Sequence, residues 1–337
     1  MNLFQVDFAS TRIVRLEQNY RSTETILKAA NSVIDHNRGR MGKKLWTDGQ
    51  AGAPIRLYAA FNEIDEGRFV VDRLQQWVRD GQRRDSVAIL YRSNAQSRVF
   101  EELLLSAAVP YRVYGGLRFF ERAEIKDALA YLRLISNRDS DPAFERVVNV
   151  PTRGIGARTI STIRELSREL DVSMWAAAVN LTGSGDLPSR TRSVVQRFID
   201  LIDELDDSTR HLELTEQTDV VVQRSGLLEH YRKQQGEKAQ TRIENLEELV
   251  SAARNFNFDP ADEEHPDPLS DFLSHAALEA GEGQAEEWED CVQLMSLHSA
   301  KGLEFPLVFL CGLEEGLFPH QRSIEEPGQL EEERRLC

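Results

Sequence analysis

The chain has 337 residues, of which 41% are hydrophobic and 29% charged, a composition typical of a soluble globular protein with room for two or three domains. No apolar run approaches the roughly 18–20 residues of a membrane span, and the N-terminal residues lack the layout of a secretory signal. The net charge of −15 argues only weakly against nucleic acid as a partner, because a local basic stripe can still bind phosphates. Three scattered cysteines without a CxxC spacing fit a reducing cytosol and argue against a disulfide framework or a zinc site, so no metal site is predicted.

Helical and strand patterns alternate over the first part of the chain. Amphipathic helices are expected at Ser22–Arg38, Ile64–Val78 and Asn94–Ala107, and strands at Ile55–Phe61, Ser86–Tyr91 and Tyr111–Tyr114. Ser22 or Thr23 can cap the first helix, and Gly39 is suited to end it. Alternation at this spacing predicts a parallel sheet covered by helices.

The pattern changes after about residue 120. From Ala123 to Leu278 the helical period dominates, interrupted by an acidic, proline-rich loop at Asp259–Pro268. Strand character returns at Val292–Leu297 and Leu307–Cys311. The sequence therefore predicts an α/β domain with a large helical domain inserted between two of its strands.

The two returning strands enclose a polar turn in the run MSLHSAKGLEFP, residues 295–306. Turns at the edge of an α/β sheet are where functional side chains are often placed. His298 could donate to a nucleic-acid phosphate, and Glu304 could accept from a ribose hydroxyl. A lone histidine or glutamate on a loop is more often a plain surface residue, so both interpretations stay open at this point.

A second polar motif, EQNYRST, occupies residues 17–23 before the first expected helix. Arg21 could reach a phosphate there, because helix N-termini favour anions, and Tyr20 offers an aromatic face for a base. Taken alone, the motif is better explained as a helix cap with a surface arginine and a half-buried tyrosine.

A third motif, YRSNAQSR at residues 91–98, directly follows an expected strand. Arg92, Ser93 and Asn94 could donate to phosphates or base edges. Ser93 or Asn94 could equally cap the following helix, and the two interpretations are compatible.

The motif PTRGIGART, residues 151–159, lies between two expected helices. Gly154 and Gly156 would let backbone amides approach a phosphate closely, and Arg153 and Arg158 supply positive charge. This arrangement resembles the hairpin of a helix-hairpin-helix element, which binds the backbone of duplex DNA without sequence specificity. A simple glycine-containing turn between helices is the alternative.

The chain contains no GxxxxGK[ST] phosphate-binding loop, and none of its expected strands ends in the paired acids of a magnesium site. Its motifs together nevertheless resemble the UvrD/Rep/PcrA-type DNA helicases of superfamily 1. The matching strings occur in family order and span nearly the whole chain: LEQNYRST (16–23), GKKLWTDG (42–49), AILYRSNAQSR (88–98), YGGLRFFERAEIKDALAYLRLI (114–135), PTRGIG (151–156), KAQTRIENLEELV (238–250), LMSLHSAKGLEFPLVF (294–309) and GLEEGLFPH (312–320).

The resemblance implies a fold and a domain order. Members of this family have two RecA-like motor domains with ATP between them, each carrying an inserted helical domain. Residues 1–17 would be the tail end of the first motor, and residues 18–114 the first part of the second RecA-like motor. Residues 115–287 would form the inserted helical domain, and residues 288–337 the second part of the second motor.

The resemblance also implies a role for residues of the nucleotide site. Gln18, Tyr20, Arg21 and Glu304 would bind ATP. Tyr20 would stack on the adenine, Arg21 would reach the γ-phosphate as a catalytic residue, and Glu304 would hold the ribose. Gln18 and Asn19 would support that loop.

Two further sets of residues would contact DNA. Single-stranded DNA would be bound by Arg92, Asn94 and His298. Duplex DNA would be bound by Arg153, Gly154, Gly156 and Arg158.

The resemblance implies part of an ATP-dependent 3′-to-5′ DNA helicase that translocates on single-stranded DNA and unwinds duplex DNA. Its expected setting is the cytoplasm, in nucleotide excision repair, mismatch repair and replication, with DNA-repair proteins as partners and no membrane. Because the family's phosphate-binding loop, acidic magnesium motif and arginine-bearing sixth motif are absent, we expect a piece of a longer protein. The longer protein would use ATP and Mg²⁺, whereas this piece alone would be inactive and would bind neither tightly. The alternatives are a non-enzymatic DNA-binding or partner-docking module, and the helicase part of a RecB-like helicase-nuclease.

Overall fold

The computed structural model describes residues 14–38, 42–114, 116–258, 267–281, 285, 289–325 and 328–337. The chain divides into two compact units: unit 1 takes Met1–Gln82, Ser86–Arg92 and Ser296–Cys337, and unit 2 takes Arg83–Asp85 and Ser93–Met295. The predicted boundaries at residues 17, 114 and 287 stay a prediction, and most of the expected tail of a first motor lies outside the described residues.

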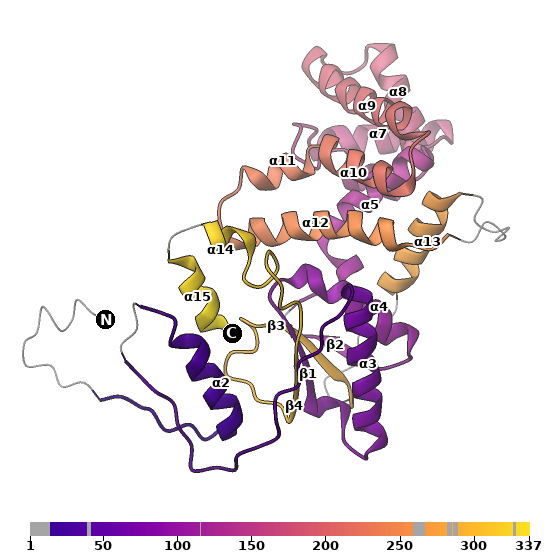
Figure 1. Ribbon diagram of the computed structural model, residues 1–337. Coiled ribbons are helices and arrows are strands. Elements are labelled where there is room, and N and C mark those ends of the chain that lie inside the picture. The colour runs from indigo at the N-terminus through magenta and orange to yellow at the C-terminus, as the bar shows by residue number, and fades with distance from the viewer. Residues whose placement is uncertain are drawn as a thin grey trace, which may run out of the picture. The chain divides into compact units, whose positions relative to one another are not determined.

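The strands of the described residues form a parallel sheet in the order β2-β3-β1-β4 (Figure 1). They are β1 (Val87–Tyr91), β2 (Tyr111–Val113), β3 (Val292–Ser296) and β4 (Leu307–Leu310). Val87 of β1 is in register with Leu307 of β4, and Tyr111 of β2 with Val292 of β3. Strand β1 is an unbroken apolar run with most of its side chains buried, as expected of a strand covered on both faces. The predicted parallel α/β sheet is confirmed.

Unit 1 contains four of the helices in the part of the chain that the structure describes: α2 (Glu24–Ile34), α3 (Glu63–Arg79), α14 (Gln321–Glu325) and α15 (Gln329–Leu336). Helix α2 is shorter at both ends than predicted, and Thr23 stands at its N-cap position without a side-chain hydrogen bond. Helix α3 is capped by Asn62, whose side chain accepts from the backbone N–H of Asp65, and it agrees with the prediction within a residue at each end.

The strand predicted at Ile55–Phe61 is wrong. These residues belong to no strand, and every one of them is exposed. Leu57 is 89% exposed and Phe61 is 97% exposed. The alternating apolar pattern is suited to a strand, but a strand needs a hydrogen-bonded neighbour, and no described segment pairs with these residues.

Unit 2 is mainly helical, as predicted. Its described α-helices are α4 (Ser97–Ser106), α5 (Ala123–Ser136), α6 (Asp141–Val147), α7 (Ala157–Leu170), α8 (Met174–Ser184), α9 (Ser189–Thr209), α10 (Leu214–Arg224), α11 (Leu227–Arg232), α12 (Glu237–Asn255) and α13 (Pro268–Gly281). No strand occurs between β2 and β3 in the described ranges. The loop predicted at Asp259–Pro268 lies largely outside the described residues, and Pro268 begins α13.

The apolar stripes of these helices meet in one core, in which Tyr131, Phe144 and Phe198 are fully buried. The rings of Phe144 and Phe198 pack edge to face with centroids 5.7 Å apart. Among the described residues, no helix is long and apolar enough to cross a membrane.

Candidate nucleotide and DNA-binding residues

The EQNYRST motif of unit 1 is fixed by backbone contacts with Trp46. The N–H of Asn19 donates to the carbonyl of Trp46 at 2.8 Å, and the N–H of Trp46 donates to the carbonyl of Glu17 at 3.1 Å. The side-chain oxygen of Asn19 then accepts from the N–H groups of Arg21 and Ser22, at 2.9 and 2.8 Å. This turn sets the direction in which the Arg21 side chain leaves the backbone.

Arg21 reaches the second motif of unit 1. Its Nε donates to Oε2 of Glu304 at 3.1 Å, and its Nη2 donates to the carbonyl of Gly302 at 3.3 Å. Gly302 has φ +96°, a conformation that other residues adopt only with strain. The Arg21 and Glu304 side chains are 49% and 72% exposed, so their ion pair contributes little to stability and can open at small cost.

Tyr20 presents its ring to solvent beside this pair. The residue is 86% exposed, and its hydroxyl donates to Oε1 of Gln18 at 2.7 Å. Gln18 donates in turn to Asp48 at 2.8 Å. These bonds hold the ring by its hydroxyl end and leave its faces open, which suits stacking on a base.

The structure thus brings Gln18, Tyr20, Arg21 and Glu304, all predicted to bind ATP, into the same part of unit 1. They combine an aromatic face, a guanidinium and a carboxylate that are all accessible. Their individual roles with a nucleotide stay predictions.

Arg92, predicted to contact single-stranded DNA, follows β1 and makes a two-point contact with Glu333 of α15. Its Nε lies 3.1 Å from Oε2 and its Nη2 lies 2.9 Å from Oε1 of that carboxylate. Glu333 is buried, and it also accepts from the hydroxyl of Ser323 at 3.1 Å and from the N–H of His320 at 3.3 Å.

This set of donors affects the protonation of Glu333. Burial by itself would raise the pKa of Glu333. The hydrogen bond and charge of Arg92, together with the hydrogen bonds from His320 and Ser323, outweigh burial, so the pKa lies below its usual value. The Arg92–Glu333 pair was not predicted from the sequence. The acidic, amphipathic pattern of residues 330–336 was visible, but it did not indicate a partner.

His298, in unit 1, is exposed in the turn after β3, where the hydroxyls of Ser296 and Ser299 are 3.0 Å apart. Asn94, in unit 2, begins a short 3₁₀ helix, and Ser93 caps this helix as the sequence suggested. The carbonyl of Asn94 accepts from Nη1 of Arg122 at 3.0 Å, whereas its side chain is exposed. The DNA contacts expected of His298 and Asn94 stay predictions.

The PTRGIGART motif connects α6 to α7 in unit 2, and its Arg153 points into the protein. The guanidinium donates to three carbonyls, those of Val147 at 3.1 Å, Pro151 at 3.1 Å and Ser225 at 2.9 Å, and to the hydroxyl of Tyr131. These contacts give Arg153 a structural role that was not predicted. Its expected role at duplex DNA stays a prediction.

The turn itself is organised by Asn149. The side-chain oxygen of Asn149 accepts from the N–H groups of Arg153, Gly154 and Ile155, at 2.8, 3.1 and 3.2 Å. Ile155 is fully buried, whereas Gly156 and Arg158 are exposed at the start of α7. An anion at this turn would therefore meet the N-terminus of α7 and Arg158, since the amide of Gly154 is already bonded.

Known proteins are similar to this chain along nearly its whole length. The family described as UvrD-like helicase C-terminal domain matches residues 14–337. DNA helicase II of Escherichia coli is 60% identical over 334 residues, which are 99% of this chain and 46% of that protein. The ATP-dependent DNA helicase PcrA of Bacillus subtilis is 42% identical over 341 residues, again 99% of this chain and 46% of that protein. The chain spans about half the length of the curated relatives it matches.

Proposed function

The chain belongs to the family of UvrD-like helicase C-terminal domains, and on this premise we propose that it is part of an ATP-dependent 3′-to-5′ DNA helicase. The observation that carries the proposal is the contact of Arg21 with Glu304. It joins two motifs from opposite ends of the chain into one accessible set of side chains with the chemistry to hold a nucleotide.

We propose that these side chains form one wall of an ATP site. The ring of Tyr20 stacks on the adenine, and the carboxylate of Glu304 accepts from a ribose hydroxyl. The guanidinium of Arg21 leaves Glu304 and donates to the γ-phosphate, where it stabilises the charge that builds up during phosphoryl transfer. Because the Arg21–Glu304 pair is exposed, this exchange costs at most about 1 kcal/mol. No residue of this chain is assigned to Mg²⁺, which would neutralise phosphate charge when bound.

We propose that single-stranded DNA is bound by Arg92, Asn94 and His298. Asn94 and His298 are exposed and offer hydrogen-bond donors of the kind that bind phosphates and base edges. Arg92 would share its guanidinium between Glu333 and a phosphate. For duplex DNA the exposed candidates are Gly156 and Arg158 at the start of α7, with Gly154 and Arg153 shaping the turn. Nucleotide excision repair, mismatch repair and replication, with DNA-repair proteins as partners, are the proposed setting, in the cytoplasm.

The test uses a helicase chimera, defined as E. coli DNA helicase II in which this chain replaces the matching segment. The 60% identity over that segment favours correct folding of the exchanged part. The chimera should unwind a duplex with a 3′ single-stranded tail in the presence of ATP and Mg²⁺, and should leave a duplex with a 5′ tail intact. A chimera that folds and binds DNA but unwinds neither substrate would contradict the proposal.

A further inference from the structure

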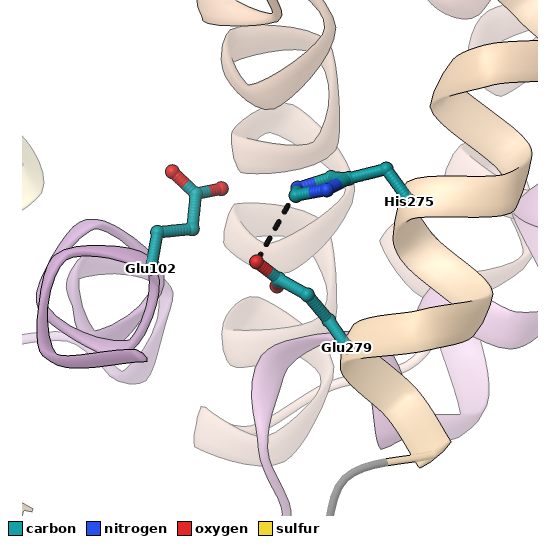
Figure 2. A group of neighbouring side chains, drawn as sticks. All are labelled: Glu102, His275 and Glu279. Atoms are coloured by element: carbon teal, nitrogen blue, oxygen red, sulfur yellow. Dashed lines mark ion pairs between the residues drawn. The ribbon is translucent and has the colours of Figure 1, made fainter. Parts of the chain in front are cut away.

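Glu102, His275 and Glu279 form a cluster of side chains in unit 2 that takes no part in the proposed helicase chemistry. Glu102 lies on α4, and His275 and Glu279 lie one turn apart on α13. Figure 2 shows the three side chains directed toward a common point between the two helices. Each offers one possible ligand atom, and these atoms all lie within 4.8 Å of one another.

We propose that this cluster binds a Zn²⁺-class divalent metal ion, which ties α13 to α4. Imidazole and carboxylate are both common zinc ligands, with bonds of about 2.0–2.2 Å. Two such ligands at a tetrahedral metal lie roughly 3.3–3.5 Å apart. Nε2 of His275 and Oε1 of Glu279 are 3.3 Å apart, so these two atoms already have the separation that a shared zinc ion requires.

The histidine is held in position by aromatic neighbours. Its ring packs against Phe120 at 6.3 Å and against Phe256 at 5.5 Å between centroids. These contacts limit the space in which the ring can rotate, and Nε2 lies 3.3 Å from Oε1 of Glu279. Glu279 is itself buried, with a side-chain exposure of 9%. A ligand pair that is positioned before the metal arrives binds it more tightly.

Glu102 supplies the third ligand from the other helix. Its Oε1 accepts from Nη1 of Arg98 at 2.6 Å, and a carboxylate can hold a metal with one oxygen while the other keeps such a hydrogen bond. Its side chain is 31% exposed, and binding a shared ion would require it to move closer to His275 and Glu279. Water would fill the fourth position, because three protein ligands leave a tetrahedral zinc ion open on one side.

The competing explanation is a plain ion pair between protonated His275 and Glu279. The hydrogen bond and charge of Glu279 raise the pKa of His275, and burial lowers it by less. The pKa of His275 therefore lies above its usual value. A proton and a zinc ion would therefore compete for Nε2, so the experiment belongs at pH 8, where zinc competes better.

The test compares zinc-dependent stability in variants of the untagged 337-residue chain after removal of metals with EDTA. Zinc at a hundredfold excess over its dissociation constant should raise the melting temperature by about 5–11 °C, and the same concentration of magnesium should not. About one zinc ion per chain should remain after dialysis, as measured by mass spectrometry of the metal. His275→Gln should abolish both effects, and Glu102→Gln should weaken zinc binding at least tenfold.

The matched control is His230→Gln. His230 also lies on a helix of unit 2, but its partner four residues later is the amide of Gln234, at 2.8 Å, which is a poor zinc ligand. This variant should keep the full zinc effect. The proposal is overturned if the unmodified chain shows no zinc effect, or if His275→Gln lowers the melting temperature equally with and without zinc. The second result would mean that the cluster is an ion pair only.

Discussion

Arg21 and Glu304 are 283 positions apart in the chain, and Nε of Arg21 donates to Oε2 of Glu304 at 3.1 Å. Neither motif alone distinguishes a nucleotide site from an ordinary surface loop. Their contact favours a nucleotide site, because it places a guanidinium, a carboxylate and the exposed ring of Tyr20 in one part of unit 1.

Replacing Tyr20 by alanine should weaken nucleotide binding without unfolding unit 1, because the ring is 86% exposed and supports no core. Stacking of an aromatic ring on a base is worth about 1–3 kcal/mol, so the KM for ATP of the helicase chimera should rise roughly tenfold. Tyr20→Phe is the matched control, since it removes the bond to Gln18 but keeps the ring. Equal KM values for the alanine variant and the parent chimera would remove Tyr20 from the site.

Replacing Glu333 by glutamine should destabilise unit 1 at neutral pH by about 2 kcal/mol, because Arg92 loses a charged partner in a partly buried place. The pKa of Glu333 is lowered in the folded protein, so the stability it contributes is present above its unfolded pKa and lost as pH falls through its folded pKa. The difference in the free energy of unfolding between the parent chain and Glu333→Gln should therefore be largest near pH 7 and should shrink below about pH 4.5. Urea unfolding at a series of pH values measures it, and a constant difference at all pH values would contradict the assignment.

Replacing Arg153 by alanine should lower the stability of unit 2 by about 2–4 kcal/mol. The reason is that the carbonyls of Val147, Pro151 and Ser225 would lose their charged donor. Because this variant could fail to fold, Arg153→Lys provides a milder change that keeps the charge but not the fork of donors. Thermal unfolding of both variants should show a lower melting temperature than the parent chain. Unchanged melting temperatures would mean that these contacts do not stabilise unit 2.

Arg158 should behave in the opposite way, because its side chain is exposed at the start of α7. Arg158→Ala should leave the melting temperature unchanged and weaken duplex binding, and the slope of log affinity against log salt should fall by about 0.9 for one lost phosphate contact. Fluorescence anisotropy with a short duplex at several salt concentrations measures this slope. An unchanged slope would mean that Arg158 makes no phosphate contact and that PTRGIGART is only a turn between helices.

Much of the fold followed from local patterns. The continuous apolar run at residues 87–91 indicated a buried parallel strand, and the helical period after residue 120 indicated the helical part of unit 2. The strand predicted at Ile55–Phe61 failed because an alternating pattern does not reveal whether a neighbouring strand is present. The C-terminal end of α2 was misplaced, since Gly39 was suited to end a helix but the helix ends at Ile34. Thr23, one of the two suggested caps, does stand at the N-cap position.

The candidate site was predictable only where a motif carries its own chemistry. Tyr20, Arg21 and Glu304 could be named as candidates, because aromatic, cationic and acidic side chains suit base, phosphate and ribose. It was the family resemblance that favoured this interpretation over a helix cap and plain surface residues, and the roles of the three residues stay predictions. The pairing of Arg92 with Glu333 and the inward direction of Arg153 could not be read, because both depend on which helices pack together. The same limit applies to the metal cluster: His275 and Glu279 have the spacing of one helical turn, but nothing in the sequence placed Glu102 beside them.

The 337-residue chain alone should not hydrolyse ATP at a measurable rate, with or without DNA, because it contains no GxxxxGK[ST] loop to hold the phosphates. The assay is phosphate release by the purified, folded chain at millimolar ATP and Mg²⁺. DNA-stimulated turnover by this chain would mean that the site described in unit 1 is more than one wall of an ATP site.

The most direct test of the central claim is the rate of DNA-stimulated ATP hydrolysis by the helicase chimera carrying Arg21→Ala. We expect a fall of at least about 100-fold, because we propose that Arg21 stabilises the charge that develops on the transferred phosphoryl group. The control is Lys28→Ala, which removes another exposed cation of unit 1, one that pairs with Glu24 on the surface of α2, and it should leave the rate unchanged. An Arg21→Ala chimera that hydrolyses ATP as fast as the Lys28→Ala chimera would contradict the account.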